Sequence, residues 1–133
     1  MESTISFDLV SPEQLVFNDK ASMIIVPGKE GDIGVLPGHS KLLSSLRSGR
    51  VMVYGEGKQL LQSFFVSSGF VEINPEKCIV LAEEVEEISA LDKDDIEQQL
   101  KELENEASKE SKKQYLIAKS KVEALESTYY EKI

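Results

Sequence analysis

Hydrophobic and polar residues follow two different periods along the chain, and the change falls near residue 88. Before it, Ile5, Phe7 and Leu9 alternate with polar neighbours at the period of two that is typical of a half-buried strand. The apolar runs in this part are 5–10, 15–17, 21–26, 50–54, 59–67, 70–73 and 78–82. Many short strands with turn residues between them predict an all-β sandwich or barrel of about ninety residues. Ser68 and Gly69, which separate two of the runs, predict a bulge or a tight corner.

After residue 88 the spacing of apolar residues becomes helical. Asp92 is suited to be the N-cap of a first helix, with Asp95 at its third position. The stripe of this helix contains Ile96, Leu100, Leu103 and Ala107, and a second stripe contains Tyr115, Ala118, Val122, Leu125 and Tyr129. No Gly or Pro interrupts residues 108–112, so a hairpin and one continuous helix are both open to the chain. We expect the hairpin, because a continuous helix leaves both stripes exposed.

Glycine and proline concentrate between Val26 and His39, a segment that holds four of the eight glycines and two of the four prolines. Gly admits positive φ and Pro lacks the N–H that a sheet ladder needs, so the segment predicts a series of tight turns without regular strand or helix. Lys29, Glu30 and Asp32 lie among these turns. A rigid, glycine-shaped loop presents such side chains at fixed positions, which is typical of a docking surface.

The composition narrows the choice of partners. The chain has 133 residues, of which 41% are hydrophobic, enough for one ordinary domain and a small appendage. A formal net charge of −9 argues against binding nucleic acid or a bare anionic membrane, and it favours partners with basic patches. The apolar runs are too short to span a membrane, and residues 1–4 do not resemble a signal peptide, so we expect a cytosolic protein. The single cysteine, Cys78, has apolar neighbours and is expected to be buried.

The sequence offers no clear pattern for catalysis or metal binding. His39 is the only histidine, and no nucleophile motif accompanies it. One Cys and one His do not supply the spacing of a zinc site, and the glycines at 28, 31 and 34 lack the Gly-Lys-Ser/Thr of a phosphate loop. The glutamates at 83, 84, 86 and 87 could suggest paired carboxylates, but a solvated acidic linker between sheet and helix is the plainer interpretation. We therefore expect no cofactor, no metal and no catalysis by this chain.

Several stretches in order resemble one known family. Residues 27–40 read PGKEGDIGVLPGHS and residues 42–49 read LLSSLRSG, and together they closely resemble the signature of the ε subunit of F-type ATP synthases, the counterpart of the mitochondrial δ subunit. The opening FDLVSPE at 7–13, the stretch VSSGFVEI at 66–73 and VLAE at 80–83 are also similar to that family. The resemblance extends over nearly the whole chain, and it is looser in the helical part.

The resemblance implies an α+β protein in two domains. Residues 1–88 would form a flattened antiparallel β-sandwich of about ten strands, and residues 89–133 an antiparallel two-helix hairpin. It also implies a non-catalytic rotor subunit of the central stalk, which couples rotation of the c ring to the catalytic head through the γ subunit. Such a subunit is peripheral, on the cytoplasmic face of the bacterial plasma membrane, without direct insertion. The implied interface with γ and the c ring comprises Lys29, Glu30, Gly31, Asp32, His39 and Ser40.

In this family the C-terminal helices regulate many bacterial members by extending along γ to the α and β subunits of the head, where they block ATP hydrolysis. Members that sense ATP carry an Arg three residues after the Asp that opens the helix, and Asp95 stands at that position here. Lys41 also stands where the family often has Pro. Because a carboxylate repels phosphate, we expect no ATP binding.

Two other functions fit the residues less well. One is a generic β-sandwich recognition module with a helical dimerisation tail. The other is a hydrolase that uses the carboxylates of Glu83, Glu84 or Asp32.

Overall fold

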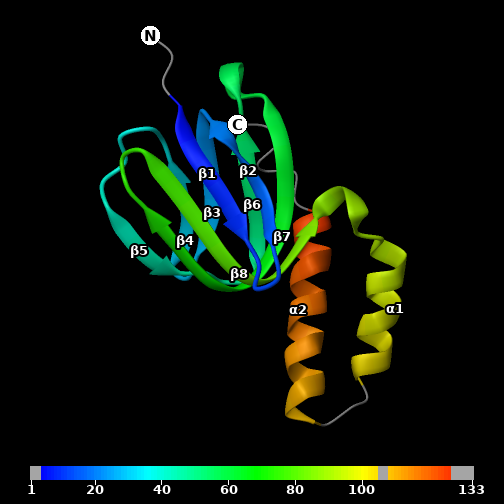
Figure 1. The fold of residues 1–133 in the computed structure, drawn as a ribbon. Helices are drawn as coiled ribbons and strands as arrows, with labels where there is room; N and C mark the ends of the chain where they lie inside the picture. The colour runs from blue at the N-terminus through cyan, green and yellow to red at the C-terminus, as the bar shows by residue number, and fades with distance from the viewer. Residues whose placement is uncertain (1–3, 105–107, 127–133) are drawn as a thin grey trace.

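The computed structural model describes residues 4–104 and 108–126, in which eight strands precede two helices (Figure 1). The strands are β1 (Ile5–Val10), β2 (Leu15–Ala21), β3 (Met23–Gly28), β4 (Gly31–Val35), β5 (Leu42–Ser45), β6 (Gly49–Tyr54), β7 (Leu60–Ile73) and β8 (Lys77–Glu87). The 3-10 turns η1 (Glu56–Lys58) and η2 (Ile88–Ala90) follow β6 and β8, and the helices are α1 (Lys93–Glu104) and α2 (Lys109–Glu126). A β-sandwich followed by two helices in contact confirms the predicted α+β class.

The strand β7 joins the two layers of the sandwich by turning a corner at Ser68 and Gly69. Its first half pairs with β6 and its second half with β5, while β8 stays in register along both halves. Ser68 and Gly69 have φ angles of 59° and 154°. A Cβ atom on Gly69 would lie 1.8 Å from the carbonyl oxygen of Leu81, so only glycine fits there. The predicted tight corner is confirmed, and the unchanged register shows that no extra residue is inserted as a bulge.

The sheet order is β2-β1-β8-β7-β6-β3-β4, with β5 paired to the second half of β7. Because β7 and β8 each pass from one layer to the other, the eight strands of the described residues supply five segments to each layer, which accounts for the expected number of about ten. One pair departs from the expected antiparallel arrangement, since β1 and β8 run parallel. No hairpin connects these two strands, so no turn forces them to run in opposite directions.

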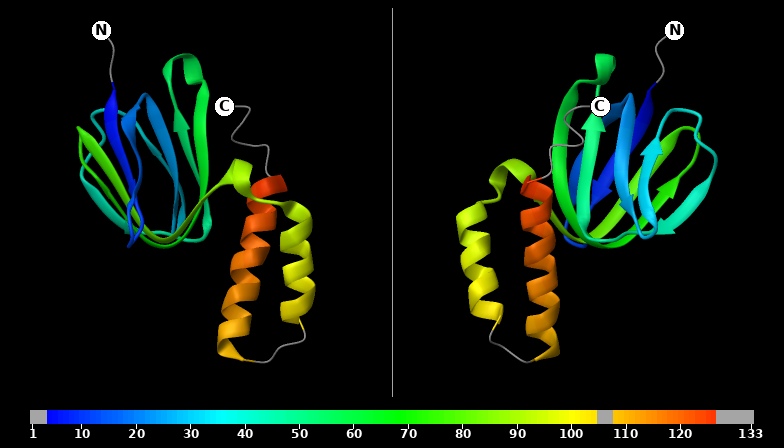
Figure 2. Two further views of the ribbon diagram at one scale, coloured as in Figure 1. Left: turned by 45° about the vertical axis from the view of Figure 1, so that its right-hand side comes forward. Right: turned by 180° about the vertical axis from the view of Figure 1, so that it is seen from behind.

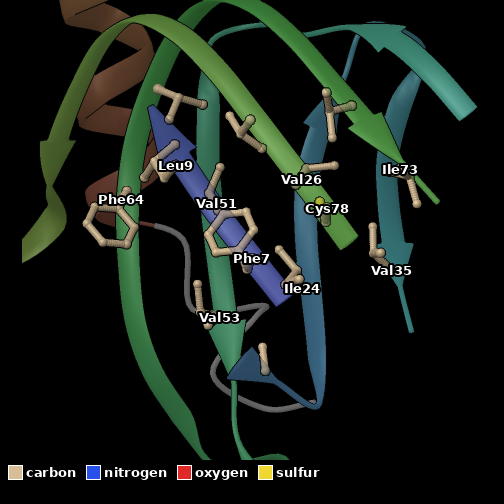
Figure 3. Close-up of a cluster of buried hydrophobic side chains, with 14 of the residues drawn as sticks. Phe7, Leu9, Ile24, Val26, Val35, Val51, Val53, Phe64, Ile73 and Cys78 are labelled. Carbon is tan, nitrogen blue, oxygen red and sulfur yellow. The ribbon is translucent and has the colours of Figure 1, made fainter. Parts of the chain in front are cut away.

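Apolar side chains from both layers meet in one core (Figure 3). Ile5, Phe7 and Leu9 of β1 point inward and have no exposed surface, as their alternation with polar neighbours predicts. Val51 and Val53 reach the same core from β6 in the opposite layer. Burial of this set is the main source of stability of the sandwich, because each such side chain contributes about 1.5–3 kcal/mol when it leaves water.

Cys78 lies in this core without exposed surface (Figure 3). Burial raises the pKa of its thiol from 9.0 to about 12, because the thiolate would lose its hydration. The unfolded chain therefore releases this proton near pH 9, while the folded chain keeps it until about pH 12, so the stability that the thiol contributes is lost as the pH rises through that interval.

We expect the free energy of unfolding to fall with pH in that interval more steeply in the wild-type chain than in Cys78→Ala, by up to about 1.4 kcal/mol per pH unit. Urea unfolding at a series of alkaline pH values measures both slopes. Parallel slopes in the two chains would show that the thiol keeps its ordinary pKa in the fold.

Regular strands occupy most of the glycine- and proline-rich segment, so the prediction of turns alone is wrong. β3 and β4 pair as far as Gly28 and Gly31, and the predicted turns are found only at residues 29–30 and 37–38. The carbonyl oxygen of Pro27 accepts a hydrogen bond of 2.9 Å from the backbone N–H of Arg47, so the polar backbone groups of Pro27 face away from β4. Proline has no backbone N–H, but at this position a backbone N–H would point away from β4. The β3–β4 ladder therefore loses no hydrogen bond at Pro27.

The glutamates at 83–87 belong to β8 and do not form the expected acidic linker. β8 pairs with β7 as far as Glu87, which lies opposite Phe64. This pairing uses backbone groups, so it continues through charged residues whose side chains reach water. Glu86, for example, is exposed and forms an ion pair of 3.3 Å with Lys121 of α2.

The two helices form the expected hairpin (Figures 1 and 2). The Oδ1 atom of Asp92 accepts hydrogen bonds from the backbone N–H groups of Asp94 and Asp95, at 2.9 and 3.4 Å, which confirms the predicted N-cap of α1. Ser108 caps α2 in the same way, since its Oγ accepts a hydrogen bond of 3.0 Å from the N–H of Ser111. Although residues 108–112 contain no Gly or Pro, the cap at Ser108 begins a second helix there. Of the two predicted stripes, Ala107 and Tyr129 lie outside the described residues.

A second face of α2 packs against the sandwich. Ile117 and Ala124 of α2 form an apolar cluster with Phe65 of β7, and Ile88 and Leu91 pack beside it. Neither Ile117 nor Ala124 belongs to the predicted stripe. Figure 2 shows that the C-terminal end of α2 lies beside the sandwich while the other end of the hairpin projects away from it.

Candidate interaction surface

The turn between β3 and β4 forms a rigid tip at one end of the sandwich. Lys29 and Glu30 occupy the two turn positions and are exposed. A Cβ atom on Gly28 would lie 2.7 Å from the carbonyl oxygen of Gly31, and Gly31 itself has a φ of 146°, so the turn depends on both glycines. The hairpin tip, residues 28–32, is therefore shaped by glycine as predicted, although it joins two paired strands.

The hairpin tip is braced by the turn between β5 and β6. The N–H of Lys29 donates a hydrogen bond of 2.9 Å to the carbonyl oxygen of Ser45. Arg47 donates from Nη1 to the carbonyl oxygen of Gly28 at 2.6 Å, and its Nη2 forms an ion pair with the carboxylate of Asp32. The carboxylate of Asp32 is thus held by an arginine of its own chain, whereas the side chain of Glu30 in the turn is exposed.

His39 and Ser40 lie at the other end of β4, away from the hairpin tip. β4 rises about 3.3 Å per residue, so its five residues separate the two groups by roughly 13 Å. The loop of His39 is attached to the β7–β8 turn, since the N–H of Gly38 donates a hydrogen bond of 2.8 Å to the carbonyl oxygen of Pro75. The Nδ1 atom of His39 lies 2.6 Å from the carbonyl oxygen of Ser40. The structure therefore divides the predicted site residues into two groups.

An exposed row of apolar side chains crosses the outer face of the layer that contains β1. Phe70 of β7 lies opposite Leu81 of β8, Leu81 opposite Val10 of β1, and Val10 opposite Leu15 of β2. Phe70, Leu81 and Leu15 are 54%, 49% and 57% exposed. We call these four residues the apolar row. Contiguous apolar surface of this kind marks interaction sites on soluble domains.

The apolar row does not follow from the alternation of apolar and polar residues that predicts half-buried strands. Each strand of the row carries an outward apolar residue directly beside an inward one, as in Phe70 and Val71 or Val80 and Leu81. Strands with apolar residues at both inward-facing and outward-facing positions are typical of sheets that are covered on both faces. Such doublets were the signal that could have predicted a covered outer face.

The apolar row and the hairpin tip border the same hollow, of about 840 Å³. Val10, Phe70 and Leu81 supply apolar parts of its lining, and Lys29, Arg47 and Glu83 supply charged parts. Apolar and charged side chains occur together in this way in protein–protein interfaces.

Other chemistry finds little support in the part of the chain that the structure describes. No group of three or more His, Cys, Asp or Glu side chains gathers there in a way that could hold a metal ion. Asp95 lies in the first turn of α1, and Asp94 beside it adds a second negative charge. None of the helices in residues 4–104 and 108–126 is long and apolar enough to cross a membrane.

Two curated relatives of the chain come from bacteria of the genus Rhodospirillum. An ATP synthase epsilon chain from Rhodospirillum rubrum is 38% identical over 132 residues, which cover 94% of this chain and 96% of the relative. The epsilon chain from Rhodospirillum centenum is 39% identical over 107 residues, covering 77% of this chain and 73% of the relative.

Solved structures share the fold at lower identity. A chain in the cryo-EM structure of the Euglena gracilis mitochondrial ATP synthase, OSCP/F1/c-ring, superimposes with a TM-score of 0.78 at 22% identity, covering 95% of this chain and 81% of that one. A chain of the Tetrahymena thermophila mitochondrial ATP synthase, central stalk/c-ring, gives 0.59 at 17% identity, covering 93% and 95%. The family model of the ATP synthase Delta/Epsilon chain β-sandwich domain matches residues 4–88. The chain therefore belongs to the ATP synthase delta/epsilon family.

Proposed function

We propose that this chain is a non-catalytic subunit of the central stalk of a bacterial F-type ATP synthase, and that it binds the γ subunit through the apolar row. The observation that supports this best is the exposure of Phe70 and Leu81 beside the braced hairpin tip. Rotor parts transmit torque, so they need rigid contacts and no reacting groups. The Tetrahymena structure, whose subject is the central stalk and c-ring, contains a chain of the same fold.

The first test is co-purification. The full chain, mixed with the γ subunit of the same bacterium, should elute with it as one complex at moderate salt. Failure to form this complex at low and moderate salt would contradict the proposal. Self-association of the chain with no affinity for γ would instead support a recognition module with a dimerisation tail.

We propose that the hairpin tip contacts the polar loops of the c ring at the cytoplasmic face of the membrane. Glu30 is the acidic residue best placed for a basic side chain of those loops, because it is exposed at the turn. Asp32 would share its carboxylate with Arg47. His39 and Ser40, at the far end of β4, would belong to a separate part of the interface with γ.

Glu30→Lys should weaken binding of the chain–γ complex to detergent-solubilised c rings about tenfold, because it places two positive charges against a basic loop. Biolayer interferometry at two salt concentrations measures this, and the loss should shrink at high salt. Glu56→Lys is the matched control, since Glu56 is exposed at the opposite end of the sandwich, in η1. Equal binding by Glu30→Lys and wild type would exclude this contact.

We further propose that residues 1–88 and 89–133 act as two domains, with the helices available to regulate ATP hydrolysis at the catalytic head. The family match ends at residue 88, where η2 begins. Asp94 and Asp95 at the start of α1 disfavour a phosphate ligand there, so the proposed regulation does not involve ATP binding by this chain.

A further inference from the structure

One buried arginine stands at the contact between α2 and the sandwich. Arg50 lies on β6 opposite Phe65 of β7 and is only 5% exposed. The residues that follow it, Val51 and Met52, have no exposed surface. A charged side chain in such surroundings is costly unless it is hydrogen-bonded.

Arg50 reaches the end of α2. Its Nη1 donates a hydrogen bond of 3.0 Å to the backbone carbonyl oxygen of Ala124, near the C-terminus of the helix. Carbonyl groups at this end of a helix have no acceptor role within the helix and carry the negative end of its dipole, so a guanidinium is well matched to them. Arg50 thus supplies a hydrogen-bond donor to a carbonyl group at the end of α2, and that carbonyl group stabilises the charge of Arg50.

A second cation strengthens the same contact from the helix side. The Nζ atom of Lys121 lies 3.3 Å from Glu86 of β8 and 5.6 Å from the centre of the Phe65 ring. Among the described residues, the apolar part of the contact comprises Phe65, Ile117 and Ala124 with two flanking residues. Charged groups thus act beside this apolar cluster in the docking of α2.

We propose that Arg50 acts as a clamp that decides whether the helical hairpin is docked on the sandwich. When α2 leaves, Arg50 and Lys121 become solvated cations, and Phe65, Ile117 and Ala124 lose their apolar contact. η2 with Leu91 is the covalent connection about which the hairpin moves. The inference concerns the chain alone and does not depend on the proposed function.

Hydrogen exchange of the full-length chain tests the clamp. Arg50→Met keeps a long side chain but removes the donor to Ala124, so we expect amides of α1 and α2 to exchange about tenfold faster while those of β7 and β8 keep their rates. Ala124→Leu should give the same pattern from the helix side, because a larger side chain separates α2 from the sheet without altering β6. Lys119→Gln, an exposed neighbour on α2, is the control and should exchange like wild type.

Two results would overturn the proposal. In one, Arg50→Met folds and leaves the exchange of α1 and α2 unchanged, whatever Ala124→Leu does. In the other, both variants speed exchange equally in the helices and the sandwich, which would mean that Arg50 stabilises the whole fold and does not govern docking. Should Arg50→Met fail to fold, Ala124→Leu decides between these outcomes, because its substitution lies outside the sheet.

Discussion

Leu81→Asp is expected to weaken binding of the γ subunit about 100-fold, because it places an unpaired carboxylate at the centre of an apolar contact. Leu81 lies between Phe70 and Val10 in the apolar row, so the substitution affects the middle of the surface. The side chain is 49% exposed in the free chain, so the fold itself should be nearly unaffected. Titration calorimetry with the γ subunit measures the affinity, and thermal unfolding of the free chain shows that the variant is folded.

Leu61→Asp is the matched control for this prediction. Leu61 is 48% exposed and lies on β7, the strand of Phe70, but in the half that pairs with β6, far along the strand from the corner. The Leu61→Asp variant should bind γ with the affinity of the wild type. If both substitutions weaken binding equally, an added negative charge lowers the affinity wherever it lies, and the apolar row has no special role.

Gly69→Ala should reduce the free energy of unfolding by about 3–5 kcal/mol, the largest effect on stability that we expect from a single methyl group. The added Cβ would lie 1.8 Å from the carbonyl oxygen of Leu81, and a φ of 154° is unfavourable for any residue with a side chain. Relief requires β7 and β8 to separate at the corner where both layers are joined. Urea unfolding followed by circular dichroism measures the loss.

The control for the corner is Gly34→Ala. Gly34 lies in β4, and a Cβ atom there has no neighbour within 4 Å. The free energy of unfolding of the Gly34→Ala variant should differ from that of the wild type by less than about 0.5 kcal/mol. A similar loss in both variants would show that the cost arises from alanine in a strand in general and not from the close approach at Gly69.

Local features of the fold could be predicted from the sequence because their causes lie within a few residues. Asp92 caps α1 through N–H groups two and three positions later, and Gly69 marks the corner of β7 directly. The strands β3 and β4 could not be predicted in this way. Whether Pro27 breaks a strand depends on which neighbour its backbone faces, and that neighbour, Arg47, is twenty positions away.

The candidate site was predicted only in part for the same reason. Lys29 and Glu30 lie at an exposed turn, as their glycine-rich surroundings suggested. His39, which is close to them in sequence, is carried to the other end of the sandwich by β4. The apolar row arises from cross-strand neighbours on four strands, and Arg50 meets Ala124 across 74 positions of chain. Such contacts follow from sheet register and layer packing, which no local pattern encodes.

If γ covers the apolar row, photo-cross-linking in the assembled synthase shows it most directly. The photoreactive residue p-benzoylphenylalanine can replace Phe70, which is 54% exposed. Because the added benzoyl group extends a side chain that already reaches water, the fold should tolerate it. The same group at position 61 serves as the comparison. We expect a cross-link to γ from position 70 and none from position 61. A cross-link from position 61 with none from position 70 would contradict it.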